Sequence, residues 1–116
     1  GAVRGRYAVE GATRVTLDED RIYFASPIDG VHALDHTGRL VWRQVIRQGS
    51  LSPPVPSDRY LVIAASDAGV YVASRESGRL LGFFKAGGGI SAEPAVDGSA
   101  LHFVSNTGFL YAATLR

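Results

Sequence analysis

Three histidines are the most chemically versatile side chains in this 116-residue chain, because imidazole ligates metal ions and exchanges protons near neutral pH. His32 and His36 lie four positions apart, and His102 lies far from both in the sequence. The chain contains no cysteine, so no thiolate is available to complete a tetrahedral metal site. We therefore predict that the histidines pack in strands or lie on the surface, and that the chain binds no metal.

Ser26, His32 and Asp35 are the residue types of a hydrolytic triad. The serine does not lie in the Gly-x-Ser-x-Gly pattern that presents the nucleophile in many hydrolases. Serines recur at Ser66 and Ser105, at intervals of 40 and 39 residues, in similar sequence surroundings. This recurrence is typical of a strand-end serine that hydrogen-bonds a turn. We predict no catalytic residue and no enzymatic activity.

Two loops have compositions found in ligand sites. Residues 87–89 are three consecutive glycines, but the Lys-Ser/Thr pair and the helix of a phosphate-binding loop do not follow them. The acidic turn at residues 18–20 lacks the alternating oxygen ligands of a calcium loop. We predict a connector for the first loop and a solvated hairpin tip for the second.

The composition is that of an ordinary globular domain, with 46% hydrophobic and 20% charged residues and a net charge of +1. Charges of both signs are scattered along the chain, so we predict no nucleic-acid partner. The longest apolar run, Tyr60 to Ala65, is far shorter than the ~20 residues that a membrane helix requires. We predict no transmembrane segment.

The elements that position these residues repeat with a period near 40. Gly30, Gly69 and Gly108 recur at intervals of 39 residues. Each glycine lies between two short runs rich in β-branched and aromatic residues, a pattern typical of strands joined by a tight turn. These runs are residues 22–25 and 31–34, 62–65 and 70–73, and 101–104 and 109–112. No segment has a sustained helical period, so we predict an all-β fold.

Two further strands complete each repeat. Gly38 and Gly78 precede apolar runs at residues 40–42 and 80–84. Another short run precedes each pair of strands, at residues 13–17, 53–55 and 93–96. Four antiparallel strands in about 40 residues are typical of a β-propeller blade. A sandwich of hairpins also has frequent turns, but it has no reason to repeat residues at a fixed period.

The strand count predicts about three blades in a single domain, residues 1–116. Residues 5–9 align with residues 38–42 and are predicted to form an outermost strand. With strands named A to D from the axis outward, the order is D-ABCD-ABCD-ABC, in blade pieces of about 1–11, 12–50, 51–89 and 90–116. Propellers typically need 4–8 blades. We expect a larger ring, completed by a head-to-tail dimer or by missing sequence of a longer chain, and we favour the dimer.

Residues 33–42, ALDHTGRLVW, resemble the tryptophan-docking motif of propellers with repeats of the pyrroloquinoline-quinone (PQQ) type. The resemblance implies that Trp42 packs flat on the neighbouring blade and that its N–H finds a backbone acceptor. The second copy, residues 72–82, has Gly82 where the tryptophan belongs, so Phe83 or Phe84 is expected to make a different contact. The predicted blade-docking residues are Trp42, Gly30, Gly38, Gly69, Gly78 and Gly108.

Within this PQQ-like repeat family, the pattern is closest to the outer-membrane assembly lipoproteins of the BamB type. That resemblance implies a non-catalytic scaffold that binds protein partners, in the periplasm or associated with the cell envelope. The quinoprotein dehydrogenases need an axis-facing tryptophan, calcium ligands and a catalytic aspartate, and they often carry adjacent cysteines. Since Trp42 is assigned to packing, we predict no cofactor. The alternatives are a ligand-sensing domain of a larger exported receptor or kinase, and a fragment of a quinoprotein dehydrogenase.

Overall fold

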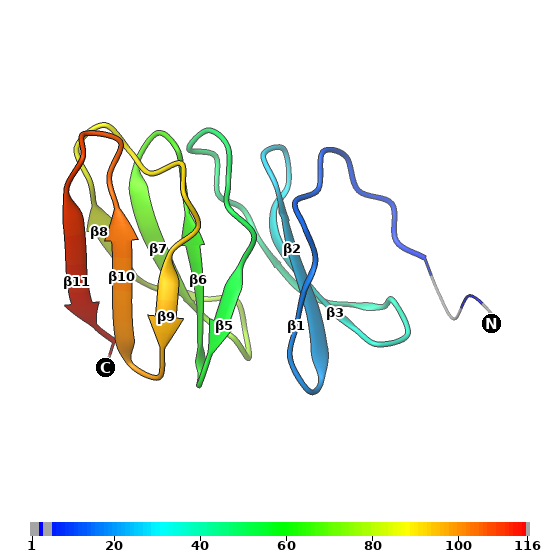
Figure 1. Ribbon diagram of the computed structural model, residues 1–116. Helices are drawn as coiled ribbons and strands as arrows, with labels where there is room; N and C mark the ends of the chain where they lie inside the picture. Colours follow the sequence, from blue (N-terminus) through cyan, green and yellow to red (C-terminus); the bar gives the residue numbers. More distant parts are fainter. Residues whose placement is uncertain (1–2, 4–5, 116) are drawn as a thin grey trace.

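The structure is a computed structural model that describes residue 3 and residues 6–115 (Figure 1). The described residues form strands only, in three sheets that follow one another along the chain. The first sheet contains β1 (Thr16–Leu17), β2 (Arg21–Ser26), β3 (Gly30–Asp35) and β4 (Leu40–Gln44). The second contains β5 (Val55–Ser57), β6 (Tyr60–Ala64), β7 (Gly69–Ser74) and β8 (Leu80–Lys85). The third contains β9 (Ala95–Asp97), β10 (Ala100–Val104) and β11 (Leu110–Thr114). No helix in these residues could span a membrane.

Each sheet is an antiparallel meander in which neighbouring strands follow each other in sequence. The first two sheets also share an irregularity, because the register between their third and fourth strands shifts at Ala33/Leu34 and at Val72/Ala73. A bulge at the same place in both sheets shows that one blade geometry is repeated. The predictions of an all-β chain and of four-stranded antiparallel blades are confirmed.

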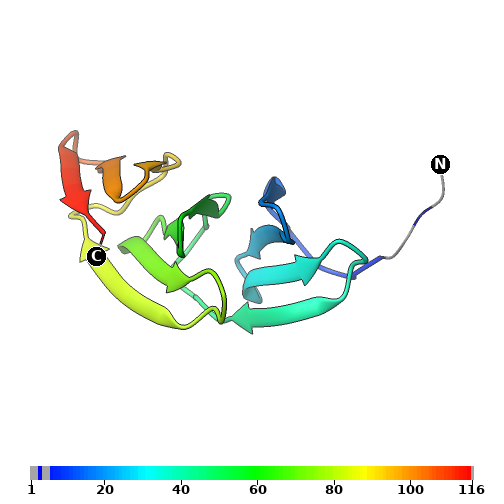
Figure 2. The same ribbon diagram turned by 90° about the horizontal axis from the view of Figure 1, so that it is seen from below.

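The sheets are arranged radially (Figure 2). The short strands β1, β5 and β9 lie on the inner side of the arc, where β5 contacts both of the others, while β4 and β8 lie on the outer side. The three blades form an open arc and not a closed ring. Blades in this arrangement meet face to face, so each internal sheet has a neighbour on both sides.

The core lies between the blades. Side chains of β6 alternate between its two neighbours: Leu61 and Ile63 pack toward the first blade, while Val62 and Ala64 pack toward the third. All five residues of β6 are buried. Burial on both faces explains why this strand is a continuous apolar run instead of an alternating one.

An ion pair connects the first and third blades on the inner side of the arc. Arg14, just before β1, places Nη2 at 2.8 Å and 2.7 Å from the two carboxylate oxygens of Glu93, just before β9. The pair skips the second blade, and both side chains are accessible to solvent.

The outer strand expected at residues 5–9 is not formed by the described residues 6–9. Hydrogen bonds show where this segment belongs in the repeat. The amide of Thr13 donates to the carbonyl of Ala25, as the amide of Ser52 donates to that of Ala64. This 39-residue offset aligns Tyr7 with residue 46, in the link that follows an outer strand. The alignment of residues 5–9 with residues 38–42 is therefore wrong by several positions, and Gly5 lies outside the described residues.

Trp42 joins the first blade to the second. Its ring is 8% exposed, and Nε1 donates to the carbonyl of Arg75 at 3.1 Å. The six-membered ring lies against Gly78, where an added Cβ would collide with it. Gly78 also has a φ of +77°, a conformation that favours glycine. The tryptophan and this glycine therefore form one contact between two blades.

We predict that Trp42→Ala lowers the free energy of unfolding by about 3–5 kcal/mol, because it removes a buried aromatic ring and leaves a cavity. Trp42→Phe keeps part of the ring and loses only the N–H donor, so a smaller loss is expected. Chemical denaturation of the three proteins measures both differences. A loss below about 1 kcal/mol for Trp42→Ala would contradict the docking role.

Candidate interaction surfaces

The third blade ends in an open strand edge. Among the described residues, β11 pairs only with β10, whereas β3 and β7 each have partners on both sides. Leu110 is 70% exposed and Phe109 is 64% exposed. β11 has the sequence LYAAT, with no charge and no proline of the kind that protects edge strands. The edge can therefore accept a further strand.

One face of the third blade is also open. The pair Val104 and Leu110 has the same place in its blade as the pair Ala64 and Val70 in the second. Ala64 and Val70 are fully buried because the third blade covers them, whereas Val104 is 47% exposed. His102 is exposed on the same strand. The face has the composition of a blade interface and no neighbour among the described residues.

A cavity of about 270 Å³ lies between the second and third blades at Gly82. The register pairs Gly82 with Val72, as it pairs Trp42 with Ala33, so Gly82 occupies the tryptophan position of its blade. A Cβ added to Gly82 would meet nothing within 4 Å. We call this cavity the Gly82 slot; its lining residues are Tyr60, Val72, Leu81, Gly82, Phe84, Thr114 and Leu115.

The two phenylalanines after Gly82 do not close the slot. Phe84 lines it and packs 6.1 Å from the ring of Phe103. Phe83 lies on the opposite side of the strand, because neighbouring side chains alternate, and its ring is 4.7 Å from that of Tyr71. Phe84 therefore makes the alternative contact expected from the sequence, and space remains beside it.

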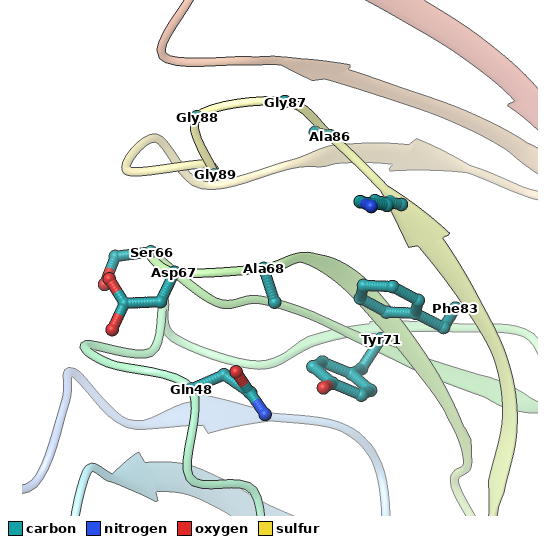
Figure 3. A pocket seen from close by; sticks show the side chains of 11 residues that line it. Gln48, Ser66, Asp67, Ala68, Tyr71, Phe83, Ala86, Gly87, Gly88 and Gly89 are labelled. Atoms are coloured by element: carbon teal, nitrogen blue, oxygen red, sulfur yellow. The ribbon is translucent and has the colours of Figure 1, made fainter.

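A second cavity, of about 570 Å³, lies where the link before β5 passes the second blade (Figure 3). The rings of Tyr71 and Phe83 lie next to each other on one side, and the Gly87–Gly89 loop lies across from Asp67 and Ala68. Gly89 donates its amide to Ala86 and accepts one from Asn106, so the loop is tied to the third blade. The three glycines connect β8 to β9, as a connector should.

His32 is buried against two aromatic rings. Its ring stacks on Phe24 at 4.8 Å, and Tyr7 contacts it edge-on at 5.5 Å. Neither ring nitrogen has a hydrogen-bond partner among the described residues. Burial lowers the pKa of His32 below its ordinary value of 6.5, while nearby Asp29 opposes this and Arg43 adds to it. The imidazole therefore packs as a neutral ring.

The other residues singled out in the sequence lie apart. His36 places Nε2 at 3.0 Å from the carbonyl of Glu19, and His102 lies on another blade. The structure shows no group of three potential metal-ligating side chains within the described part of the chain.

The serines and Asp35 hydrogen-bond turns. Ser26 donates to the carbonyl of Glu10 at 2.6 Å, and Ser66 accepts the amide of Ser50 at 2.8 Å. Ser105 accepts the amide of Phe109 at 3.2 Å. The hydroxyl of Thr37 and the amides of Thr37 and Arg39 hold the pKa of Asp35 below its usual value. Ser26, His32 and Asp35 therefore form no hydrogen-bonded triad.

The expected docking glycines differ in their surroundings. Gly30, Gly38, Gly78 and Gly108 have positive φ, and Gly69 does not. An added Cβ would strike backbone atoms of Gln44 at Gly30 and of Phe84 at Gly69, so both glycines allow an outer strand to approach closely. At Gly108 a Cβ would meet nothing within 4 Å, since no fourth strand lies beside β11 among the described residues.

Sequence reasoning missed a polar contact between the first two blades. Asp18 accepts the phenolic hydroxyl of Tyr23 at 2.5 Å and lies 3.4 Å from the Nε of Arg75. Burial acts to raise the pKa of Asp18, but these groups and two backbone amides outweigh it, and the pKa is lowered. The acidic turn is thus partly structural. Its signal in the sequence, an aspartate five positions before a tyrosine, was too weak to predict a contact with a distant arginine.

Comparison with known proteins identifies the repeat. The family model for the outer membrane protein assembly factor BamB matches residues 1–81. The chain belongs to this family. The BamB of Legionella pneumophila (strain Paris) is 26% identical over 96 residues, which are 81% of this chain and 25% of that protein. The chain thus spans about a quarter of its BamB relative.

The fold also resembles a designed protein. The crystal structure of the computationally designed Ika4 protein matches with a TM-score of 0.80 and 14% identity, over 90% of this chain and 66% of the other. At this identity, the likeness concerns the fold alone.

We predict that the chain loses stability as the pH falls below about 6.5, because the unfolded state then binds a proton at His32 that the folded state does not. The loss continues until the lowered pKa of folded His32 is reached, and each pKa unit of lowering contributes about 1.4 kcal/mol. Thermal unfolding between about pH 7.5 and pH 5.5 measures it. His32→Phe should flatten the dependence over this range; equal slopes for both proteins would refute the assignment.

Proposed function

We propose that the chain is a non-catalytic protein-interaction module that acts as a scaffold in the assembly of outer-membrane proteins, in the periplasm or at the cell envelope. The observation that carries this proposal is the pairing of BamB family membership with an open blade face and an open strand edge. Exposed strand edges and apolar faces bind other polypeptides through main-chain hydrogen bonds and burial of side chains. The BamB relative, by its name, serves in outer-membrane protein assembly.

The open surfaces also indicate how the arc is completed. Three blades are fewer than the 4–8 of a ring, so the outer face of the third blade needs a neighbour. Further blades of a longer protein provide one solution, since the BamB relative is about four times as long as the matched region. For the isolated chain we propose a head-to-tail dimer. In it, the face that carries Val104 and Leu110 packs on the side of the first blade where Phe24 and Tyr7 lie.

This dimer differs from a strand exchange through residues 5–9, because the described residues 6–9 lie on the first blade as a link. Packing of blade faces requires no such exchange. It repeats the arrangement seen between the first and second blades, where apolar side chains of facing sheets form a shared core.

We predict that the isolated chain self-associates and that Leu110→Lys weakens the association, because a charge would be buried on the open face. Light scattering over a range of protein concentrations measures the mass. Ile28→Lys is the matched control, since Ile28 is 51% exposed in a turn away from that face. A monodisperse monomer of 12.3 kDa at every concentration would refute the dimer.

The scaffold function is tested by a chimera in which this chain replaces the matched segment of the Legionella pneumophila BamB. If the module supports assembly, cells that rely on the chimera should contain outer-membrane proteins at levels close to those with the intact factor. A chimera carrying Trp42→Ala is the control, because its blades should separate. Failure of a well-expressed chimera to restore these levels would reject the proposal.

A further inference from the structure

The two blade interfaces differ at a single equivalent position. Between the first and second blades, the indole of Trp42 fills the space beside Gly78 and donates to the carbonyl of Arg75. Between the second and third blades, Gly82 takes the tryptophan position and the slot stays open. One repeat thus shows the ring that the other lacks.

The slot has the size and chemistry for an indole. Its volume of about 270 Å³ exceeds the ~150 Å³ of an apolar protein cavity that holds benzene. Tyr60, Val72 and Leu115 form buried walls, and Phe84 adds an aromatic side. By the register of the two blades, Thr114 corresponds to Ser74, so Leu115 corresponds to Arg75. The backbone that accepts the N–H of Trp42 thus has a counterpart at the new site.

The slot adjoins the open strand edge. Thr114 is the last residue of β11 and also lines the slot. In the other blades, the strand beside the third one runs antiparallel to it and begins near this end. A polypeptide added to β11 in that direction would therefore start beside the slot. A second copy of this chain cannot supply the ring, because its only tryptophan, Trp42, is buried in its own first interface.

We propose that the Gly82 slot and the edge of β11 together bind an extended segment of a partner protein, whose tryptophan side chain enters the slot. This inference deepens the proposed scaffold function and rests on it, since it names the kind of segment that the module recognises. The strand supplies main-chain hydrogen bonds, and the indole supplies selectivity for one residue of the partner.

The test uses three probes on the purified chain: a short valine-rich peptide with one tryptophan, the same peptide with alanine in its place, and free indole. Amide resonances report the site by NMR. The tryptophan peptide should shift Gly82, Thr114 and Leu115, and the alanine peptide should bind about tenfold more weakly or less. Free indole should shift the slot residues at higher concentrations.

Two variants separate the parts of the site. Gly82→Trp fills the slot from within, so it should abolish indole binding and reduce peptide affinity to that of the alanine peptide. Gly87→Trp is the matched control, because its Cβ also has open space but lies in the loop outside the slot. Thr114→Pro removes a donor from β11 and should weaken the peptide while leaving indole bound.

Unchanged binding in Gly82→Trp, equal affinity of the tryptophan and alanine peptides, or shifts confined to other residues would overturn the proposal. These outcomes are distinct from failure of the scaffold function. A chimera that restores outer-membrane proteins while the tryptophan peptide leaves the slot unshifted would reject the site and keep the function. A slot that binds the peptide in a chain whose chimera is inactive would do the reverse.

Discussion

The structure depends on the burial of each sheet face by the next sheet. No blade has a core of its own, because a single four-stranded sheet has no interior. Stability comes from facing pairs of sheets, as in the two clusters on either side of β6. Each added blade buries one face and exposes another, so an arc of any length ends in apolar surface. The surfaces proposed for binding are therefore a direct result of the way the fold is stabilised.

The two interfaces balance apolar packing and polar contacts differently. In the first, Trp42 fills the gap near Gly78, and Tyr23, Asp18 and Arg75 add a hydrogen-bonded group beside it. The second relies on Phe84 and Phe103 and leaves a cavity at Gly82. Unfilled volume lowers the stability of an interface, because the lining atoms lose partners. The junction between the second and third blades is thus the better place to separate sheets or to admit a side chain.

The sequence predicts the blades well because glycine turns and apolar runs recur at a fixed interval. Gly30 and Gly69 identify where an outer strand passes close to the backbone, and the register confirms four strands in each of the first two sheets. The sequence fails at the first residues, where matching Gly5 to Gly38 ignored the spacing from Thr13 to Ser52. The salt-bridged group at Asp18 also escapes prediction, since its partners come from two blades. Local patterns specify strands, whereas contacts between blades depend on how the strands assemble.

The ion pair between Arg14 and Glu93 bears on the geometry of a complete assembly. It draws the inner ends of two blades together across the one between them, so it favours a tightly curved arrangement. Its side chains face solvent, where dissolved ions screen the attraction. The angle between successive sheets therefore rests partly on a contact that weakens as salt is added, and the number of sheets that fit around one axis would then respond to the ionic surroundings.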